Sequence, residues 1–248
     1  MREATGPALR VAALAKHYGK FKALAGIDLE VAAGETFGLV GANGAGKTTL
    51  IKCLLDLAAF DSGTAEIFGV PVRNPLARRR LAYLPERFVP PHFMRGREFL
   101  ALMCELGGGR YDEAAVKRLL DELELEHGAL ARQVRTLSKG MTQKLGLAAC
   151  LALERDLYVL DEPMSGLDPA ARVAAKAALT RLAGERRTLF FTSHVLADVE
   201  ELCSSIAVLD RGGVRFRGAP AELSARYAEA SLERAFMRCI REQPAAHA

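Results

Sequence analysis

Short apolar runs recur in the first third of the chain, and turn-forming residues separate them. Apolar runs bounded by glycine, aspartate, serine or proline are typical of β-strands. Turn signals lie at Ala33-Gly34, Asp61-Ser62-Gly63 and Phe68-Gly69. The strands predicted in this way are Leu9–Leu14, Ile27–Val31, Thr36–Val40, Ala65–Ile67 and Leu81–Leu84. Of these, Leu9–Leu14, Ile27–Val31 and Ala65–Ile67 are predicted to form an antiparallel β subdomain, because short strands with this spacing are typical of one.

The apolar period becomes helical between about residues 88 and 153. Apolar residues three and four positions apart place their side chains on one face of a helix. The stripes run over Phe99–Leu106, Val116–Leu123 and Leu145–Leu153. Gly107-Gly108-Gly109 ends the first of them, because consecutive glycines interrupt helices. We therefore predict an inserted helical subdomain within a single domain that spans residues 1–248.

Strands and helices alternate in the last third of the chain. The predicted order is strand Leu157–Leu160, helix Ala170–Leu182, strand Thr188–Thr192, helix Val195–Cys203 and a hairpin of Ile206–Leu209 with Val214–Phe216, whose turn is Arg211-Gly212-Gly213. This alternation predicts a mainly parallel sheet with helices on both faces. The tail of about residues 219–248 contains an amphipathic helix with Leu232, Phe236 and Ile240 on its apolar face, which we expect to pack on the core. Gln243–Ala248 reads as a loose end.

Composition narrows the class of protein. Half of the 248 residues are hydrophobic, which suits a well-packed globular unit. The net charge of +4 is too small to indicate a nucleic-acid partner, although it is compatible with an anionic membrane surface. The sequence has no apolar run long enough for a membrane-spanning helix and no apolar signal core at its start. We therefore expect a cytosolic chain whose membrane role, if it has one, needs a partner.

The five cysteines are scattered among apolar helical residues, and no two of them form a C-x-x-C pair. This arrangement predicts buried thiols and not disulfides or metal ligands. The residues are Cys53, Cys104, Cys150, Cys203 and Cys239.

The segment Gly41–Thr49 reads G-A-N-G-A-G-K-T-T and matches the phosphate-binding pattern G-x-x-x-x-G-K-[ST]. A predicted strand precedes it, and helical spacing over Thr48–Leu57 follows, which is the strand–loop–helix context that this pattern requires. Glycines let the main chain approach phosphate oxygens, and backbone N–H groups at a helix start form an anion site. We expect Lys47 to reach the β and γ phosphates and the Thr48 hydroxyl to bind Mg²⁺. The fold class is thus α/β, a P-loop NTPase core with the antiparallel β and helical subdomains added.

Two acids end the strand Leu157–Leu160. A carboxylate at a strand end beside a phosphate loop is placed to bind Mg²⁺, which makes Asp161 the metal candidate. Glu162 is then free to face an attacking water, as a general base or as the group that orients it. The alternative is a solvated acidic turn.

The set of motifs from Leu9 to Gly218 resembles the nucleotide-binding subunit of an ATP-binding cassette (ABC) transporter. Leu137-Ser138-Lys139-Gly140-Met141 resembles the family signature L-S-G-G-Q, and Ser165-Gly166-Leu167-Asp168 matches the D-loop. His194 matches the switch histidine that senses the γ-phosphate, and Tyr18 matches the aromatic that stacks on adenine. The resemblance implies catalytic roles for Glu162, His194 and Lys47. The nucleotide-binding residues that it implies are Tyr18, Gly41, Asn43, Gly44, Ala45, Gly46, Lys47, Thr48, Thr49, Ser138 and Gly140.

Three positions depart from the family pattern. Glu86 stands where glutamine is usual, and with Thr48 and Asp161 it completes the expected Mg²⁺ ligands. Lys139 and Met141 replace glycine and glutamine in the signature, and Lys139 is either a charge offered to ATP or a solvated surface lysine. These variations, together with the segment Ser231–Phe236, resemble the exporter-type subfamily.

The resemblance implies an ATPase that binds ATP and Mg²⁺ at the cytoplasmic face of the membrane and energises export through a separate integral membrane permease. One phosphate loop and one signature per chain imply a homodimer, or a heterodimer with a related subunit, that closes around ATP and opens after hydrolysis. The apolar patch Phe88–Met94 suits a permease contact or merely covers the core. A soluble ABC protein that acts on ribosomes or DNA, and a non-catalytic sensor, are the competing interpretations.

Overall fold

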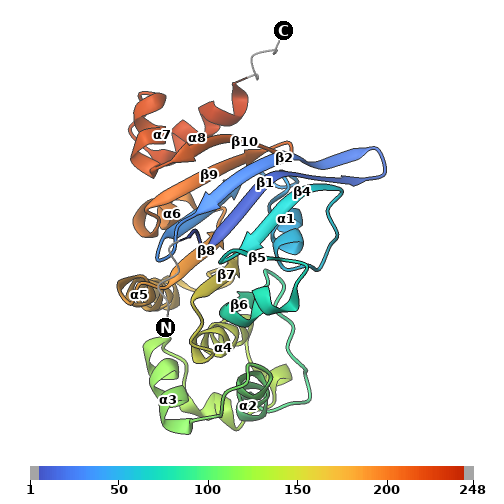
Figure 1. The fold of residues 1–248 in the computed structure, drawn as a ribbon. Coiled ribbons are helices and arrows are strands. Elements are labelled where there is room, and N and C mark those ends of the chain that lie inside the picture. The colour runs from blue at the N-terminus through green and yellow to red at the C-terminus, as the bar shows by residue number, and fades with distance from the viewer. Residues whose placement is uncertain (1–5, 243–248) are drawn as a thin grey trace. The chain divides into compact units, whose positions relative to one another are not determined.

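The computed structural model describes residues 6–242, and its contacts divide them into two compact units. The first unit comprises the chain up to Arg78 together with the part that begins at Phe190, and the second comprises Arg79–Leu189 (Figure 1). The second unit contains the predicted helical segment of about residues 88–153. The start of the chain and the predicted loose end, Gln243–Ala248, lie outside the described residues.

An antiparallel sheet forms one part of the first unit, as the closely spaced strands predicted. Its strand order is β2-β1-β4-β5, seen as the blue and cyan arrows of Figure 1. The strands are β1 (Leu9–Tyr18), β2 (Phe21–Val31), β4 (Ser62–Ile67) and β5 (Val70–Pro71). The hairpin of β1 and β2 extends further than its apolar residues indicated, because its distal half carries the polar residues Lys16, His17 and Lys22.

A second group of strands, with both parallel and antiparallel pairing, forms the other part of the first unit. The buried strand β3 (Thr36–Gly41) pairs in parallel with β9 (Ser205–Asp210), which pairs antiparallel with β10 (Gly213–Gly218). Helices α1 (Lys47–Leu54) and α6 (Leu196–Leu202) contact β3. Strand β8 (Thr188–Thr192) leads from the second unit into the first, where Phe190 stacks on Phe37 with ring centroids 5.8 Å apart.

The C-terminal tail packs on the core of the first unit, as predicted. Helices α7 (Pro220–Arg226) and α8 (Leu232–Arg241) contact each other, and α8 also contacts α6, β9 and β10. The apolar face of α8 buries Leu232, Ala235 and Cys239. Among residues 6–242, no helix has both the length and the apolar surface needed to cross a bilayer.

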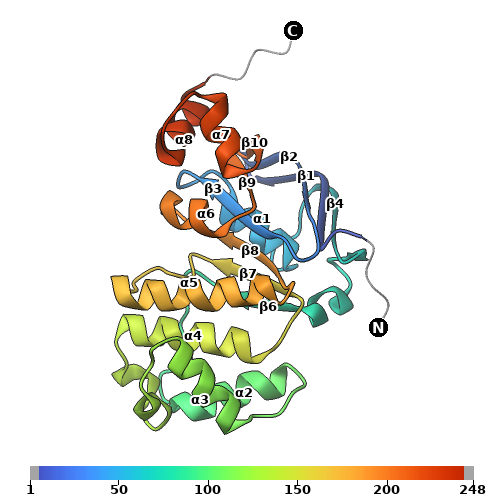
Figure 2. The same ribbon diagram turned by 90° about the vertical axis from the view of Figure 1, so that its left-hand side faces the viewer.

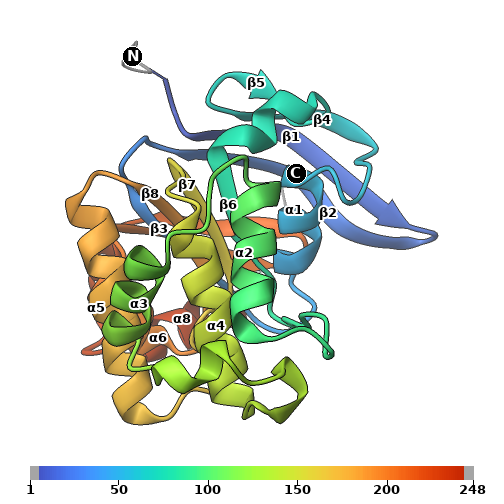
Figure 3. The same ribbon diagram turned by 90° about the horizontal axis from the view of Figure 1, so that it is seen from below.

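The second unit is mostly helical. A short 3₁₀ helix, η1 (Pro75–Arg80), leads into β6 (Leu81–Leu84), which pairs in parallel with β7 (Leu157–Asp161). Helix α4 contacts both α2 and α3, and α3 contacts α5 (Figures 2 and 3). The helices are α2 (Gly96–Leu106), α3 (Glu113–Glu122), α4 (Lys139–Ala152) and α5 (Pro169–Gly184), with short 3₁₀ turns η2 (His127–Leu130) and η3 (Val134–Thr136) between α3 and α4.

All five cysteines are buried free thiols, which confirms the expectation from the sequence. Burial raises the pKa of each thiol, and it raises that of Cys150 to about 12. A thiolate is the reactive form, so raising the pKa lowers reactivity at neutral pH. At pH 8, the thiolate fraction of Cys150 is about a thousandfold below that of an ordinary cysteine.

We therefore expect a disulfide reagent such as dithionitrobenzoate to label none of the five thiols rapidly in the native chain at pH 8. All five react in guanidinium, where burial no longer raises their pKa values. Rapid native labelling, measured by absorbance of the released thiol, would contradict this description of the core.

Candidate functional site

The predicted phosphate-binding loop lies between β3 and α1, in the strand–loop–helix context that its pattern requires. Gly46 is the N-cap of α1 and has a φ of 113°, which side-chain-bearing residues rarely adopt. A Cβ atom at Gly46 would lie 2.6 Å from the Ala23 carbonyl oxygen, and one at Gly41 would lie 2.4 Å from that of Leu209. Glycine is therefore required at both positions by backbone packing as well as by chain conformation.

The N-terminus of α1 has no capping side chain, and no acid lies in its first turn. Its first N–H groups and the positive end of its dipole are thus available to an anion. The Lys47 ammonium donates to the carbonyl oxygens of Gly41 and Ala42, at 2.6 and 3.3 Å, which holds it over the loop. Asn43, Gly44 and Thr48 are exposed, whereas Ala45 is buried and anchors the loop. These features fit a triphosphate.

The turn between β9 and β10 positions the loop. The Gly212 N–H donates to the Ala45 carbonyl (2.9 Å), and the Gly212 carbonyl accepts from the Ala25 N–H in β2 (2.7 Å). Gly212 has a φ of 77°, and a Cβ atom there would lie 2.8 Å from the Ala23 carbonyl oxygen. One glycine of the C-terminal half thus joins the phosphate-binding loop to the antiparallel sheet. The sequence analysis missed this role and assigned Gly212 only to a hairpin turn.

Tyr18 lies at the end of β1 with 49% of its surface exposed, so its ring can accept a stacking partner. Lys16 lies over the ring, with its Nζ atom 5.2 Å from the centroid. The neighbouring Asp61 carboxylate accepts from the His17 N–H at 2.6 Å and contacts the His17 ring at 3.0 Å and Lys16 at 3.3 Å. These contacts lower the pKa of Asp61, and the hydrogen bond with the His17 ring has the largest effect. The Asp61 carboxylate therefore stays charged, and keeps its contacts with the end of β1, until acid pH.

His194 lies between β8 and α6 in the first unit. The Ser193 hydroxyl oxygen accepts from the Val195 N–H at 3.0 Å, which fixes the turn around the histidine. The side chain of His194 is exposed, as a sensor of a bound nucleotide must be. Helix α6 begins at Leu196 without a side-chain cap, so His194 is not a capping residue.

The carboxylates of the second unit lie at one edge of its strands. Strands β6 and β7 are parallel, with Leu84 opposite Leu160, so Glu86 and Asp161 follow neighbouring strand ends. Asp161 is 3% exposed and Glu86 is exposed. Burial, with added repulsion from Asp161 and then Glu86, raises the pKa of Tyr83 to about 12. Tyr83 is thus a neutral hydroxyl beside this acidic edge. Among residues 6–242, no three His, Cys, Asp or Glu side chains form a metal-binding group.

Glu162 follows the last residue of β7 and has a φ of 51°, in the left-handed region. This conformation is unfavourable for a residue with a Cβ atom, and such strain is found where surrounding structure imposes it, often at functional sites. It turns the chain sharply after Asp161, so the two acids do not follow the simple alternation of a strand. The side chain of Glu162 is half-buried. The sequence analysis predicted the role of Glu162 but had no signal for this conformation.

Ser138 is the N-cap of α4, and its hydroxyl oxygen accepts from the Met141 N–H at 3.1 Å. A Cβ atom at Gly140 would lie 3.3 Å from the Gly166 carbonyl oxygen, so the start of α4 lies against the Ser165–Asp168 segment. The Lys139 stem packs at Gly166, since a Cβ atom there would lie 2.8 Å from Lys139 Cε. Lys139 is thus an exposed residue whose stem packs on Gly166.

Gln143 connects this helix start to the acidic edge. Its side chain is 6% exposed, and its amide nitrogen donates to the Pro163 carbonyl oxygen at 2.9 Å. Pro163 directly follows Glu162, so α4 and the segment carrying the candidate base are held together within the second unit. The Asp168 side chain caps α5 by accepting from the Ala171 N–H at 2.8 Å. Sequence reasoning missed Gln143, which lies two positions before the predicted stripe Leu145–Leu153 and has no motif of its own.

Comparisons with known proteins agree with this fold. The family model described as ABC transporter matches residues 24–165. An ABC transporter ATP-binding protein of Synechocystis sp. is 38% identical over 207 residues, which cover 82% of this chain and 58% of that protein. The Nod factor export ATP-binding protein I of Paraburkholderia xenovorans is 37% identical over 214 residues, covering 85% of this chain and 70% of that protein.

A solved ATP-binding subunit of an ABC transporter is also similar. It is 30% identical, with a TM-score of 0.85, and the match covers 93% of this chain and 98% of that chain. The chain spans less than two thirds of the length of the Synechocystis relative. The family model covers more than half of the sequence, including the phosphate-binding loop, the signature segment, Asp161 and Glu162. The chain therefore belongs to the ABC transporter ATP-binding family, and its α/β fold is that of an ABC ATPase cassette.

Proposed function

We propose that the chain hydrolyses ATP to drive export through a separate integral membrane permease at the cytoplasmic face of the membrane. The observation that carries this proposal is the uncapped start of α1, with the Lys47 ammonium held by the carbonyl oxygens of Gly41 and Ala42 in the loop. Lys47 and the N–H groups of Asn43–Thr49 would bind the phosphates, and Tyr18 would stack on adenine. Relatives named for Nod factor export support the export direction.

The metal would be held by Thr48 with Asp161 and Glu86. Oxygen ligands of this type suit Mg²⁺, which keeps several waters and binds through few protein groups. When bound, the ion neutralises charge that builds up on the phosphate oxygens.

In the reaction, Glu162 would take a proton from a water molecule as its oxygen attacks the γ-phosphorus. The bond from that phosphorus to the bridging oxygen of ADP breaks, and inorganic phosphate and ADP result. His194 would donate a hydrogen bond to a γ-phosphate oxygen and so distinguish ATP from ADP. The strained turn at Glu162 favours this role, because it fixes the base after a buried strand end.

Two subunits would bind two ATP molecules, and each ATP would contact both subunits. Ser138 and Gly140 lie at the N-terminus of α4, which offers partial positive charge and N–H donors to a phosphate. One chain carries one such segment and one phosphate-binding loop, so we propose that α4 of one subunit faces the ATP held by the other. A homodimer and a heterodimer with a related subunit both satisfy this arrangement.

The permease would contact the predicted apolar patch. Val89 is 67% exposed and Phe93 is 77% exposed, whereas Pro90 is buried and Phe88 packs edge-on against Phe99. The segment therefore divides into residues that cover the core and residues that remain available. A groove of about 390 Å³ beside it has Arg87, His92 and Arg135 in its lining. Its apolar and basic lining suits a short amphipathic segment with acidic residues.

A Ser138→Arg variant tests the shared site. The added bulk blocks the start of α4, so we expect ATP hydrolysis to fall about a hundredfold, as when one transition-state donor is lost. Binding of ATP to the chain's own loop should stay within about twofold, since Lys47 and its loop are unchanged. Thr180→Arg adds the same charge to an exposed face of α5 and serves as the control. Full hydrolysis by Ser138→Arg would contradict the shared site.

A further inference from the structure

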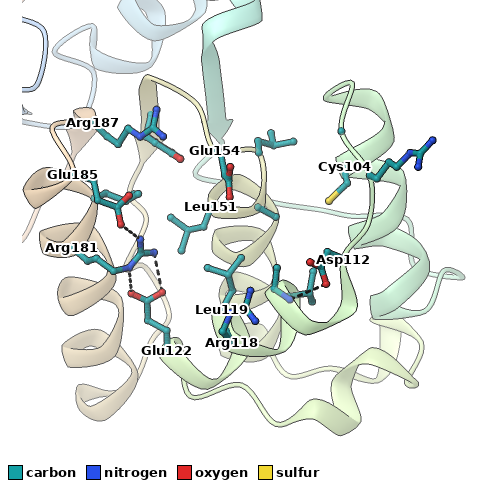
Figure 4. A pocket seen from close by; sticks show the side chains of 18 residues that line it. Cys104, Asp112, Arg118, Leu119, Glu122, Leu151, Glu154, Arg181, Glu185 and Arg187 are labelled. Atoms are coloured by element: carbon teal, nitrogen blue, oxygen red, sulfur yellow. Dashed lines mark hydrogen bonds and ion pairs between the residues drawn. The ribbon is translucent and has the colours of Figure 1, made fainter.

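A cavity of about 710 Å³ lies inside the second unit, away from the segments assigned above. Figure 4 shows side chains of α3, the C-terminal end of α4 and the last turns of α5 gathered around it. One face of α3 lines it through Ala115, Arg118, Leu119 and Glu122, which are spaced three and four residues apart. Its volume is in the range of small-molecule sites, about 300–1,000 Å³.

Some of the charged side chains that line the cavity already form ion pairs within the protein. Arg181 makes a two-pronged ion pair with Glu122, at 2.7 and 3.0 Å, and a third contact with Glu185 at 2.6 Å (Figure 4). Arg187 pairs with Asp156 at 3.1 Å. The Arg181–Glu122 pair joins α3 to α5, and these pairs leave the guanidinium groups of Arg181 and Arg187 little capacity for a ligand.

Two other arginines of the lining are not paired. Within residues 6–242, the guanidinium groups of Arg110 and Arg118 have no hydrogen-bond or ion-pair partner. Arg110 precedes α3 and Arg118 lies in its second turn, and both residues line the cavity. Guanidinium groups match the paired oxygens of carboxylates and phosphates.

The floor of the cavity offers a buried donor. Tyr158 is 1% exposed, and its hydroxyl oxygen accepts from the Arg155 N–H at 3.1 Å. The hydroxyl proton itself has no acceptor in the described part of the chain. Burial raises the pKa of Tyr158 to about 12, so the group remains a donor at neutral pH. Apolar side chains, including Leu119, Leu151 and Leu182, complete the lining.

We propose that this cavity binds an organic anion of metabolite size, whose carboxylate or phosphate pairs with Arg110 and Arg118 while its apolar body packs against the leucines. The site is separate from the proposed ATP site. Helices α4 and α5 reach the cavity with their C-terminal ends, and their N-terminal ends carry Ser138 and Asp168. At 1.5 Å per residue, the 14 residues of α4 span about 21 Å between the two.

Fluorine NMR titration tests the proposal on the whole chain with excess ADP and Mg²⁺, which occupy the phosphate-binding loop. The probes are para-(trifluoromethyl)benzoate and para-(trifluoromethyl)phenyl phosphate, and the neutral para-(trifluoromethyl)benzamide is the matched control. We expect at least one anionic probe to bind about tenfold or more tightly than the amide, as a charged hydrogen bond predicts.

The variant Arg110→Gln/Arg118→Gln should weaken binding of the anion about tenfold or more, and Ala115→Leu should weaken it by filling the cavity. Arg79→Gln removes an unpaired arginine outside the cavity and should change nothing. Thermal unfolding confirms that each variant is folded. Failure of both anions to bind at millimolar concentration, equal binding of the amide, or unchanged binding by the double arginine variant would each overturn the proposal.

Discussion

Replacing Glu162 by glutamine is expected to slow ATP hydrolysis by a factor of about 10² to 10⁴, the range that a positioned general base contributes. Glutamine keeps the size of the side chain and cannot accept the proton of the attacking water. ATP affinity should stay close to that of the unchanged chain, because the phosphates are bound by the loop before α1. Phosphate release measures the rate, and equilibrium binding of a fluorescent ATP analogue measures the affinity.

The matched control for this variant is Glu105→Gln. Glu105 lies on the exposed face of α2, and its carboxylate has no partner within the described residues. The Glu105→Gln variant removes the same charge as Glu162→Gln and should leave the rate of ATP hydrolysis unchanged. A Glu162→Gln variant that hydrolyses ATP at the original rate would show that another group accepts the proton, and the strained turn would then have a purely structural origin.

Replacing Lys47 by alanine is expected to weaken ATP binding by about 10- to 100-fold, since a hydrogen bond to a charged group contributes about 1.5–3 kcal/mol. The ammonium lies over the loop in the structure, held by the Gly41 and Ala42 carbonyls. Its loss removes both the charge that faces the triphosphate and these loop contacts. Titration calorimetry with ATP and Mg²⁺ gives the affinity directly.

Lys52→Ala is the control for this second variant, because Lys52 lies on the same helix with its side chain exposed in the last turn. It should bind ATP with unchanged affinity. If Lys47→Ala bound as tightly as the control, the loop would hold phosphate by its backbone alone, and the role assigned to Lys47 would be wrong.

Local patterns predicted most elements of this fold. The strand–loop–helix at Gly41–Thr49, the alternation from Leu157 onward and the amphipathic α8 depend on neighbouring residues, which is why they could be identified from the sequence. Boundaries were less accurate. We predicted that the first helix extends to Leu57, but it ends at Leu54 because Asp56 adopts a φ of 58° and the Leu57 N–H donates back to the Lys52 carbonyl. Such endings are usually marked by glycine, and none is present here.

The connections of the candidate site could not be predicted, because they join residues far apart in the chain. Gly212 links the phosphate-binding loop to β2, and Gln143 links α4 to Pro163. Neither residue stands out in a one-dimensional pattern. The left-handed conformation of Glu162 was equally unpredictable, since glutamate gives no local signal for a positive φ and only the surrounding structure imposes it.

The central claim is that two copies of the chain, or one with a related subunit, close around bound ATP. Light scattering coupled to size exclusion tests it most directly on the Glu162→Gln variant, in which ATP should persist unhydrolysed. With ATP and Mg²⁺ we expect a mass near twice that of the 26.8 kDa chain, and with ADP the mass of one chain. If the chain alone remains a monomer with ATP and Mg²⁺, adding a related subunit under the same conditions should give a complex with the mass of two chains. A mass of one chain under every condition, with ATP shown to be bound, would contradict the account.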